Sequence, residues 1–245
     1  MSGHSKWSKI QHKKGAADAK RGNIFTKLGK AISIAAQQGG GDPEMNFSLR
    51  LAIDRAKGAN MPKDNIERAI KRGTGELKDG AELQEIIYEG FGTGGVAIIV
   101  ETVTDNSNRT VSDVKSVFNR TGGSLGGPNA VKWQFEQKAV LRVAQEKLDA
   151  MSEKKDELEL ALMDAGAEDI INSEFGLEIR AVREDFAKLL ETLKNFDLEP
   201  DDSGLEWIAK ETIDLDDEKS TKLNKMVEAF EELDDVEAVY TNESE

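Results

Sequence analysis

Residues 84–104 read QEIIYEGF-GTGG-VAIIVETVT, and this stretch decides the fold. Two runs rich in Ile, Val and Tyr, 84–91 and 96–104, flank a glycine-rich segment, which is typical of a β-hairpin. A dinucleotide-binding loop would need a helix after its glycines, whereas here a second strand-like run follows. We therefore interpret residues 92–95 as a turn and place a sheet at the centre of the chain.

Upstream of the hairpin, apolar residues recur at helical spacing. We expect helices from residue 23 to the glycines at 39–41, over 47–57 and over 64–73. Asp64 and Glu67 would form the capping box of the third helix, and Gly73 would end it. Three such helices bury little apolar area alone, so we expect this part to lean on its neighbour.

Downstream of the hairpin, helix and strand patterns alternate. Helices are expected over 110–119, 148–165, 184–196 and 218–233, the first opening with a capping box of Thr110 and Asp113. Strands are expected over 130–135, 138–144, 170–172, 177–182, 205–213 and 236–240. This order suggests two split βαβ units, each with helices on one face of its sheet.

The fold class predicted from these patterns is α+β. A three-helix domain is followed by two small α/β domains of split βαβ, ferredoxin-like type, one inserted in the other. The expected boundaries are a basic tail at 1–22, a helical domain at 23–80, a central domain at 81–136 plus 205–245, and an insert at 137–204.

Charge divides the chain sharply. Residues 1–78 hold 16 Lys and Arg against 7 Asp and Glu, a balance of +9, and the remaining residues hold 17 against 40, a balance of −23. In the first 30 residues Asp18 is the only acid. A basic arm on an acidic body indicates a polyanionic partner.

Composition excludes several classes of protein. The chain has no Cys, which removes disulfides, thiolate nucleophiles and Cys-based zinc sites. No apolar run approaches the roughly 20 residues that span a bilayer, and the basic N-terminus lacks the apolar stretch of a secretory signal. We expect a cytoplasmic monomer with no cofactor and no membrane contact.

The basic arm carries the best functional hypothesis, because Lys and Arg neutralise phosphates and release counterions. Trp7 lies within the basic run, where an aromatic ring can stack on an unpaired base. The alternative is a solvated basic face. The candidate nucleic-acid-binding residues are Lys6, Trp7, Lys9, Lys13, Lys14, Lys20, Arg21, Lys27, Lys30, Lys63, Arg68, Lys71 and Arg72.

A second candidate is an anion site at residues 106–110. This polar loop leads into a helix N-terminus, whose free N–H groups can accept a phosphate or a carboxylate. Its candidate residues are Asn106, Asn108, Arg109 and Thr110. Ordinary helix capping explains the same residues equally well.

Other chemistry is weakly supported. His4 and His12 are the only histidines and lack a third metal ligand nearby. Acidic pairs and runs at 201–202, 214–218, 231–232 and 234–235 suggest a two-metal hydrolase as a third alternative, although such runs are usually solvated surface. We expect no metal site.

The chain resembles the YebC family along nearly its whole length. The matching blocks are GHSKW (3–7), DAKRG (18–22), NMPKDNI (60–66), YEG (88–90), TDN (104–106), NRT (108–110), AGAED (165–169), DDV (234–236) and VY (239–240). The mitochondrial relative in this family is a translational activator of cytochrome c oxidase. One departure is GPNA at 127–130, where the family usually has a Gly-Ser-Val turn.

The resemblance implies three domains, the third inserted in the second, and no enzymatic activity. It implies a DNA-binding transcriptional regulator or, as the alternative, a ribosome-associated translation factor that binds ribosomal RNA and relieves stalling at proline-rich stretches. Phosphate contacts alone do not separate DNA from RNA. The first hypothesis from the sequence is therefore a non-enzymatic nucleic-acid-binding regulator.

Overall fold

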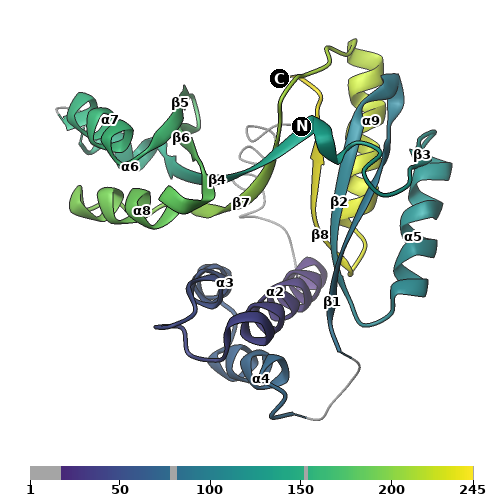
Figure 1. Ribbon diagram of the computed structural model, residues 1–245, viewed down its shortest axis with the longest axis horizontal. Helices are drawn as coiled ribbons and strands as arrows, with labels where there is room; N and C mark the ends of the chain where they lie inside the picture. The colour runs from purple at the N-terminus through teal and green to yellow at the C-terminus, as the bar shows by residue number, and fades with distance from the viewer. Residues whose placement is uncertain (1–17, 78–81, 152–153, 245) are drawn as a thin grey trace. The chain divides into compact units, whose positions relative to one another are not determined.

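The computed structural model of the protein describes residues 18–77, 82–151 and 154–244. Their contacts divide the chain into two units, each described by itself. Among the described residues, those from 135 to 211 form the insert, and those from 18 to 134 together with 212–244 form the main unit. Figure 1 follows both units by colour along the chain. The three N-terminal helices and the first sheet therefore belong to one unit.

The main unit begins with α2 (Asp18–Gly39), α3 (Phe47–Gly58) and α4 (Lys63–Gly73). Helix α2 packs against both of the others. Apolar residues spaced three or four apart on each helix, joined by Met61 from the turn before α4, build the core between them: Ile32, Ala35, Ala36, Leu49, Ile53, Ala56, Met61, Ile66 and Ala69. The predicted stripes therefore form one small core.

The ends of these helices differ from the prediction. Helix α2 begins at Asp18, inside the expected tail. Helix α4 starts directly after Pro62 without a side-chain cap, so the predicted capping box of Asp64 and Glu67 is wrong. Because Lys63 is already helical, Asp64 lies within the first turn, where a carboxylate still interacts favourably with the helix dipole.

The sheet of the main unit has the strand order β3-β1-β2-β8, and every pairing in it is antiparallel. Its strands are β1 (Gln84–Phe91), β2 (Ala97–Thr104), β3 (Ser124–Leu125) and β8 (Val236–Thr241). The hairpin is confirmed, with Phe91 opposite Ala97. Gly94 and Gly95 have φ of 75° and 81°, a conformation that favours glycine.

Helices α5 (Ser107–Arg120) and α9 (Asp217–Glu231) share one core with this sheet. The rings of Phe118 and Phe230 meet edge to face at 4.8 Å between centroids. Helix α2 contacts β2 and β8. There Ile34 of α2 forms a separate apolar cluster with Leu83 and Val103, so the helical part packs on the sheet through α2.

The insert holds a second antiparallel sheet with the order β5-β6-β4-β7. In chain order its elements are β4 (Phe135–Ala144), α6 (Gln145–Asp149), α7 (Lys155–Asp164), β5 (Ala167–Ser173), β6 (Gly176–Ala181), η5 (Arg183–Asp185), α8 (Phe186–Asn195) and β7 (Asp202–Ala209). This is the arrangement of a split βαβ unit. The predicted α+β class, three helices followed by two sheets with helices, is confirmed.

Three predictions about this region differ from the structure. The strand expected over 205–213 is β7, which pairs with β4 in the insert and does not complete the first sheet. Residues 130–134 form a loop and η3 (Lys132–Gln134), and no separate strand. The helix expected over 148–165 is divided into α6 and α7. A sequence pattern identifies a strand, but only long-range packing selects its partner.

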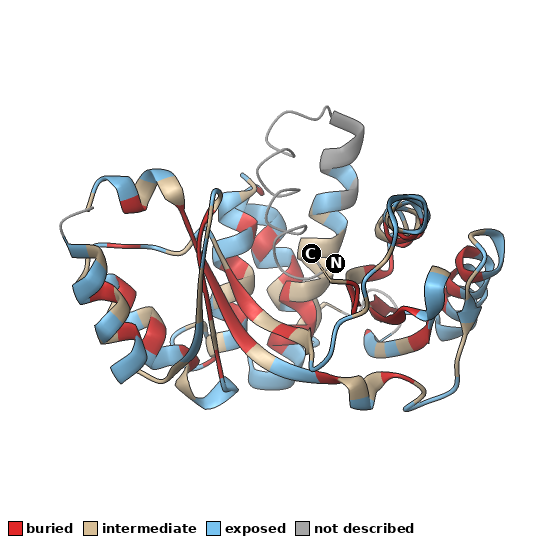
Figure 2. Cartoon of the chain, turned by 90° about the horizontal axis from the view of Figure 1, so that it is seen from above, coloured by how far each residue is buried: buried red, intermediate tan, exposed pale blue. Residues whose placement is uncertain are grey.

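Most of the buried residues lie along the strands and on the helix faces turned toward them, as Figure 2 shows. Of the helices that the structure describes, none has both the length and the apolar character required to cross a membrane.

Candidate nucleic-acid interface

The predicted basic arm is only partly covered by the structure. Lys6, Trp7, Lys9, Lys13 and Lys14 lie outside the described residues. Lys20 and Arg21, two further candidates, lie in the first turn of α2. Lys27 is the first of the predicted residues whose side-chain contacts are described.

Lys27 and Lys30 point toward the C-terminal part of the chain. The Nζ of Lys27 donates to the carbonyl of Glu231 at 2.6 Å. The Nζ of Lys30 donates to the carbonyl of Asp234 at 2.9 Å and to Oδ1 of Asp235 at 2.6 Å. The side chain of Lys30 is only 12% exposed, so its charge faces Asp235 and not the solvent.

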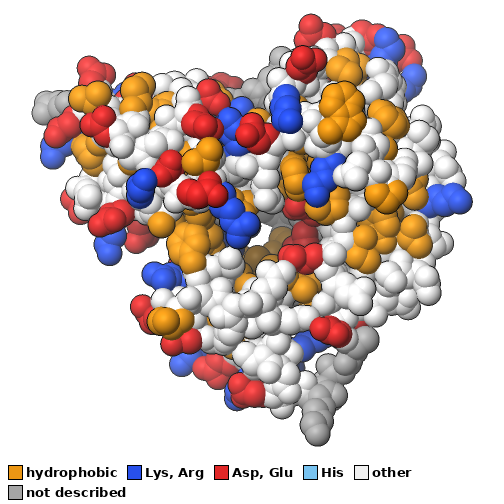
Figure 3. Space-filling view, in the orientation of Figure 1, with side chains coloured by type: hydrophobic (Ala, Val, Ile, Leu, Met, Phe, Trp, Pro, Cys, Tyr) orange, Lys and Arg blue, Asp and Glu red, His pale blue; other side chains and the backbone are white. Residues whose placement is uncertain are grey.

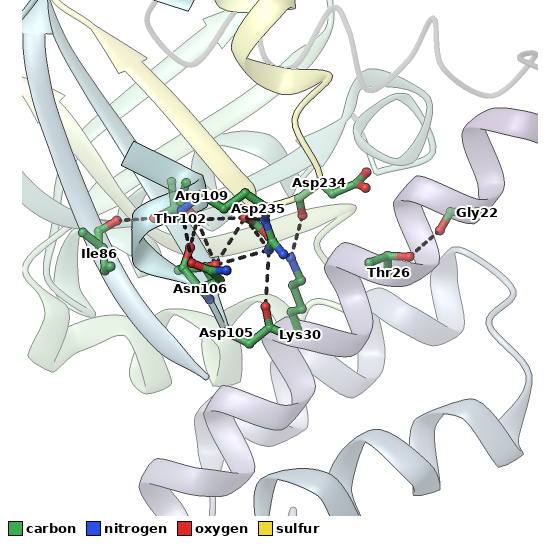
Figure 4. A network of polar contacts seen from close by, with 12 residues as sticks. Gly22, Thr26, Lys30, Ile86, Thr102, Asp105, Asn106, Arg109, Asp234 and Asp235 are labelled. Atoms are coloured by element: carbon green, nitrogen blue, oxygen red, sulfur yellow. Dashed lines mark hydrogen bonds and ion pairs between the residues drawn. The ribbon is translucent and has the colours of Figure 1, made fainter. Parts of the chain in front are cut away.

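Asp235, the residue directly before β8 (Val236–Thr241), joins α2 to α5 (Figure 4). Besides Lys30 of α2, its carboxylate accepts from Nη2 of Arg109 and from Oγ1 of Thr110, both at 2.8 Å and both on α5. Burial by itself raises the pKa of Asp235, but the hydrogen bonds from Lys30, Arg109 and Thr110 outweigh it and lower the pKa to about 2. We call these four residues the Asp235 cluster.

The Asp235 cluster occupies the anion site that the sequence predicted at residues 106–110. Asn106 caps α5 by accepting from the backbone N–H of Arg109 at 3.1 Å. The hydrogen bond to Asp235 also raises the pKa of Arg109. Asn108 is exposed and takes no part in the cluster. The anion that Arg109 and Thr110 bind is thus a carboxylate of the chain itself.

Helix α4 presents the remaining candidates. Arg68 and Lys71 are exposed and lie one turn apart, on the side opposite the buried Ile66 and Ala69. Lys63 is 87% exposed and forms an ion pair with Glu67 at 3.5 Å. These side chains can meet a phosphate without giving up an internal contact that holds the fold.

Arg72 behaves differently from its neighbours on α4. It is half-buried, and its Nη2 lies 3.7 Å from Oδ2 of Asp105 in the loop before α5. Lys63, Arg68 and Lys71 are therefore exposed on α4, whereas Arg72 of the same helix is half-buried beside Asp105.

Helix α3 carries three basic residues that the sequence reasoning missed: Arg50, Arg55 and Lys57, all exposed. The signal was present, because these residues lie away from the buried stripe of Leu49, Ile53 and Ala56. In the face shown in Figure 3, basic and acidic side chains are interspersed over the part of the main unit that holds α3 and α4.

A partly buried carboxylate of β8 lies close to basic side chains of α2 and α3. Glu237 of β8 has its Oε1 shielded from solvent and without a hydrogen-bond partner among the described residues. Burial raises the pKa of Glu237 to about 7, although the charges of Lys27, Lys30 and Arg55 oppose the shift, and Glu101 adds to it. The carboxyl group of Glu237 therefore stays protonated at a pH at which an exposed glutamate has lost its proton.

A second buried acid, Glu89 of β1, organises the loop before η3. Its carboxylate accepts from the backbone N–H groups of Asn129, Val131 and Lys132 at 2.7, 2.8 and 2.7 Å. The sequence assigned Glu89 no role. Its partners are backbone N–H groups, which every residue except proline carries, so no basic side chain in the sequence indicates the contact.

The insert contains the converse arrangement. Arg142 of β4 is fully buried and binds Glu178, Asp202 and Glu206 at 2.7, 3.0 and 2.8 Å. Burial by itself lowers the pKa of Arg142, but the hydrogen bond to Glu206 and the charges of Glu206, Glu178 and Asp202 raise it above its usual value. We call these four residues the Arg142 cluster.

Several of the acidic residues that motivated the hydrolase alternative have structural partners. Asp202 belongs to the Arg142 cluster, Asp201 accepts from the backbone N–H of Ala144 at 2.8 Å, and Asp216 caps α9. Across the described residues, no three or more His, Cys, Asp or Glu side chains are grouped so as to hold a metal ion. His4 and His12 lie outside the described residues.

Two family models match the chain. Residues 5–76 match the TACO1/YebC protein N-terminal domain, and residues 83–243 match the TACO1/YebC second and third domain. Together they cover the main unit and the insert.

Curated relatives and a solved structure give the same result. A "probable transcriptional regulatory protein" of Dehalococcoides mccartyi is 50% identical over 99% of this chain and 94% of its own length. One of Fusobacterium nucleatum with the same description is 46% identical over 99% and 95%. The crystal structure of a conserved hypothetical protein from Aquifex aeolicus is 40% identical, with a TM-score of 0.84 over 93% of this chain and 91% of that one.

Proposed function

The chain belongs to the TACO1/YebC family, and from this premise we propose that it is a non-enzymatic, nucleic-acid-binding regulator of gene expression. Its relatives carry the name of transcriptional regulatory proteins, which supports regulation of transcription through DNA as the first form of the proposal. The basic N-terminal third is the surface that would meet the phosphate backbone.

One observation carries the proposal. On α4 the side chains of Arg68 and Lys71 are exposed on one helix face, while Lys27 and Lys30 of α2 are engaged within the protein. The structure therefore separates cations that hold the fold from cations left on the surface. The surface cations continue the charge of the first 21 residues, where Lys and Arg outnumber the single acid, Asp18. Phosphate contacts of this kind bind without reading sequence.

The test is the salt dependence of binding. We expect full-length protein to bind polynucleotides with an affinity that falls as salt rises. Replacing Arg68 and Lys71 by Ala should reduce the slope of log K against log salt by about 0.9 per lost contact on duplex DNA. Replacing Lys6, Lys9, Lys13 and Lys14 together by Ala should reduce the slope further.

A matched control is available on α9. Lys219 and Lys222 have the same spacing as Arg68 and Lys71 and are also exposed. Replacing both by Ala removes the same charge and should leave the slope unchanged. If the arm variant and the α4 variant both keep the wild-type slope, the proposal is wrong.

The same protein should be tested on duplex DNA and on ribosomes. Retention on duplex DNA together with sedimentation away from ribosomes supports the transcriptional form. Co-sedimentation with ribosomes at low salt that is lost as salt rises would instead support the alternative, a ribosome-associated translation factor.

A further inference from the structure

Trp133 is a large aromatic side chain held at the surface of the main unit. It is 68% exposed, whereas aromatic residues are usually well buried. It lies on η3 between two buried anchors, Val131 at 0% and Phe135 at 3% exposure. Its Nε1–H donates to the carbonyl of Ala130 at 3.3 Å, so the polar edge of the indole is satisfied within the loop.

The backbone around Trp133 is held in place from below. The carboxylate of Glu89 accepts hydrogen bonds from the backbone N–H groups of Asn129, Val131 and Lys132, which lie just before Trp133 in the sequence. The carbonyl of Glu89 also accepts from the N–H of Gly126 at 2.7 Å. Bonds to a buried carboxylate are among the stronger hydrogen bonds in proteins. The indole therefore stands on a loop that needs little ordering before it binds.

We propose that Trp133 is a stacking platform for an unpaired nucleobase. The proposal rests on the proposed function, since it adds a base contact to the phosphate contacts of α4. Stacking requires one accessible ring face and tolerates any base. A stable protein partner would require a far larger surface. An exposed indole on an anchored loop suits an unpaired base of a single strand.

The experiment separates bases from phosphates. Full-length wild type and Trp133→Ala are titrated with an oligothymidylate of about 12 nucleotides and with an abasic oligonucleotide of the same length. We expect Trp133→Ala to weaken binding of the oligothymidylate by about fivefold to a hundredfold and to leave binding of the abasic strand unchanged. The salt slope should not change, because the indole carries no charge.

The control is Leu160→Ala, which removes another exposed apolar side chain, 62% exposed on α7 of the insert. It should leave both affinities at the wild-type value. Trp133→Phe keeps an aromatic ring and should recover most of the binding. Trp133 lies at the surface, so its replacement leaves the core intact.

A second variant tests the support of the loop. Glu89→Gln has one carbonyl oxygen in place of the two carboxylate oxygens that receive three N–H groups. With Trp133 unchanged, oligothymidylate binding should fall severalfold, and abasic-strand binding should not.

The outcomes distinguish this inference from the proposed function. If wild type binds no polynucleotide, both fail. If wild type binds polynucleotides and Trp133→Ala binds the oligothymidylate equally well, or if wild type binds duplexes but no single strand, the stacking proposal alone is overturned. Loss of a protein partner without any loss of nucleic-acid binding would also overturn it.

Discussion

The Asp235 cluster of the main unit and the Arg142 cluster of the insert are built with opposite charges. In the first, one carboxylate is held by a lysine, an arginine and a hydroxyl. In the second, one guanidinium is held by three carboxylates. In each cluster a single charge of one sign is thus held by partners of the other sign or by a hydroxyl.

The two clusters also differ in what they join. Arg142 lies opposite Glu178 of β6 and Asp202 of β7, so its cluster spans neighbouring strands of a single sheet. The partners of Asp235 come from α2 and α5, and Lys30 is separated from it by 205 positions. The Arg142 cluster therefore stabilises one sheet, whereas the Asp235 cluster fixes the N-terminal helix to the C-terminal strand.

Breaking the Arg142 cluster should have the largest effect. Arg142→Met leaves buried carboxylates without their main cation, and we expect a loss of about 3–5 kcal/mol in the free energy of unfolding. Urea denaturation followed by hydrogen exchange at the amides of β4 would measure it. Arg183→Met, at an exposed position of the insert, should change the free energy by less than about 0.5 kcal/mol. A similar loss in both variants would contradict the assigned role.

Glu237 should make the free energy of unfolding of the main unit depend on pH. Unfolded Glu237 ionises near pH 4.5, whereas the folded group stays protonated up to about 7. Between these values the unfolded state binds fewer protons, so stability falls as pH rises. Glu237→Gln should remove this fall and raise stability at pH 8 by about 3 kcal/mol. Unfolding curves from pH 4 to 8 would show it, and a wild-type profile in the variant would refute it.

The stabilising effect of the Asp235 cluster should depend on pH in the opposite direction to that of Glu237. The folded pKa of Asp235 is about 2 and its ordinary value is 3.8, so its stabilising effect is present above about pH 4 and is lost as pH falls toward 2. Asp235→Asn should cost about 2 kcal/mol at neutral pH, less than the loss of Arg142, because Arg109 is half exposed and solvent screens it. Thermal unfolding would measure the difference.

Asp234→Asn is the matched control for Asp235→Asn. Asp234 contributes its backbone carbonyl to Lys30 and is otherwise exposed, so the substitution leaves that contact in place. The control should keep wild-type stability. Equal losses at both positions would show that the carboxylate of Asp235 is not the group that matters.

The smallest effect is expected inside the Asp235 cluster. Thr110→Val keeps the shape of a buried side chain but removes the hydroxyl that donates to Asp235. We expect a loss of about 1 kcal/mol and a rise in the pKa of Asp235, which NMR titration of its carboxyl carbon would follow. Thr221→Val, on the exposed side of α9, should change neither quantity.

The sequence predicted local structure well where the signal is local. The hairpin was specified by two β-rich runs around glycines that adopt positive φ, and the stripes of α2, α3 and α4 by residues three and four apart. Helix starts were predicted less well, since Asn106 and Pro62 precede α5 and α4 where Thr110 and Asp64 were expected as caps. A side chain that can cap does so only if the backbone turns at that residue.

The candidate interface was predicted by charge, and charge alone does not say where a side chain points. Lys30 and Arg68 look alike in the sequence, yet Lys30 binds Asp235 and Arg68 lies on the surface. For Arg109 and Thr110 the sequence left an anion site and ordinary helix capping equally open, and both residues bind Asp235. Their partner lies more than a hundred residues away, beyond the reach of any local pattern.

The sequence by itself determined the class of the fold, the β-hairpin at its centre, the division of charge between the basic first third and the acidic remainder, and the family resemblance. These depend on periodicity and composition, which are local or additive properties. Only the tertiary structure decided which sheet β7 joins, which lysines remain on the surface, and that Glu89 supports the loop of Trp133. Those outcomes depend on contacts between distant segments, whose energies exist only after the chain has folded.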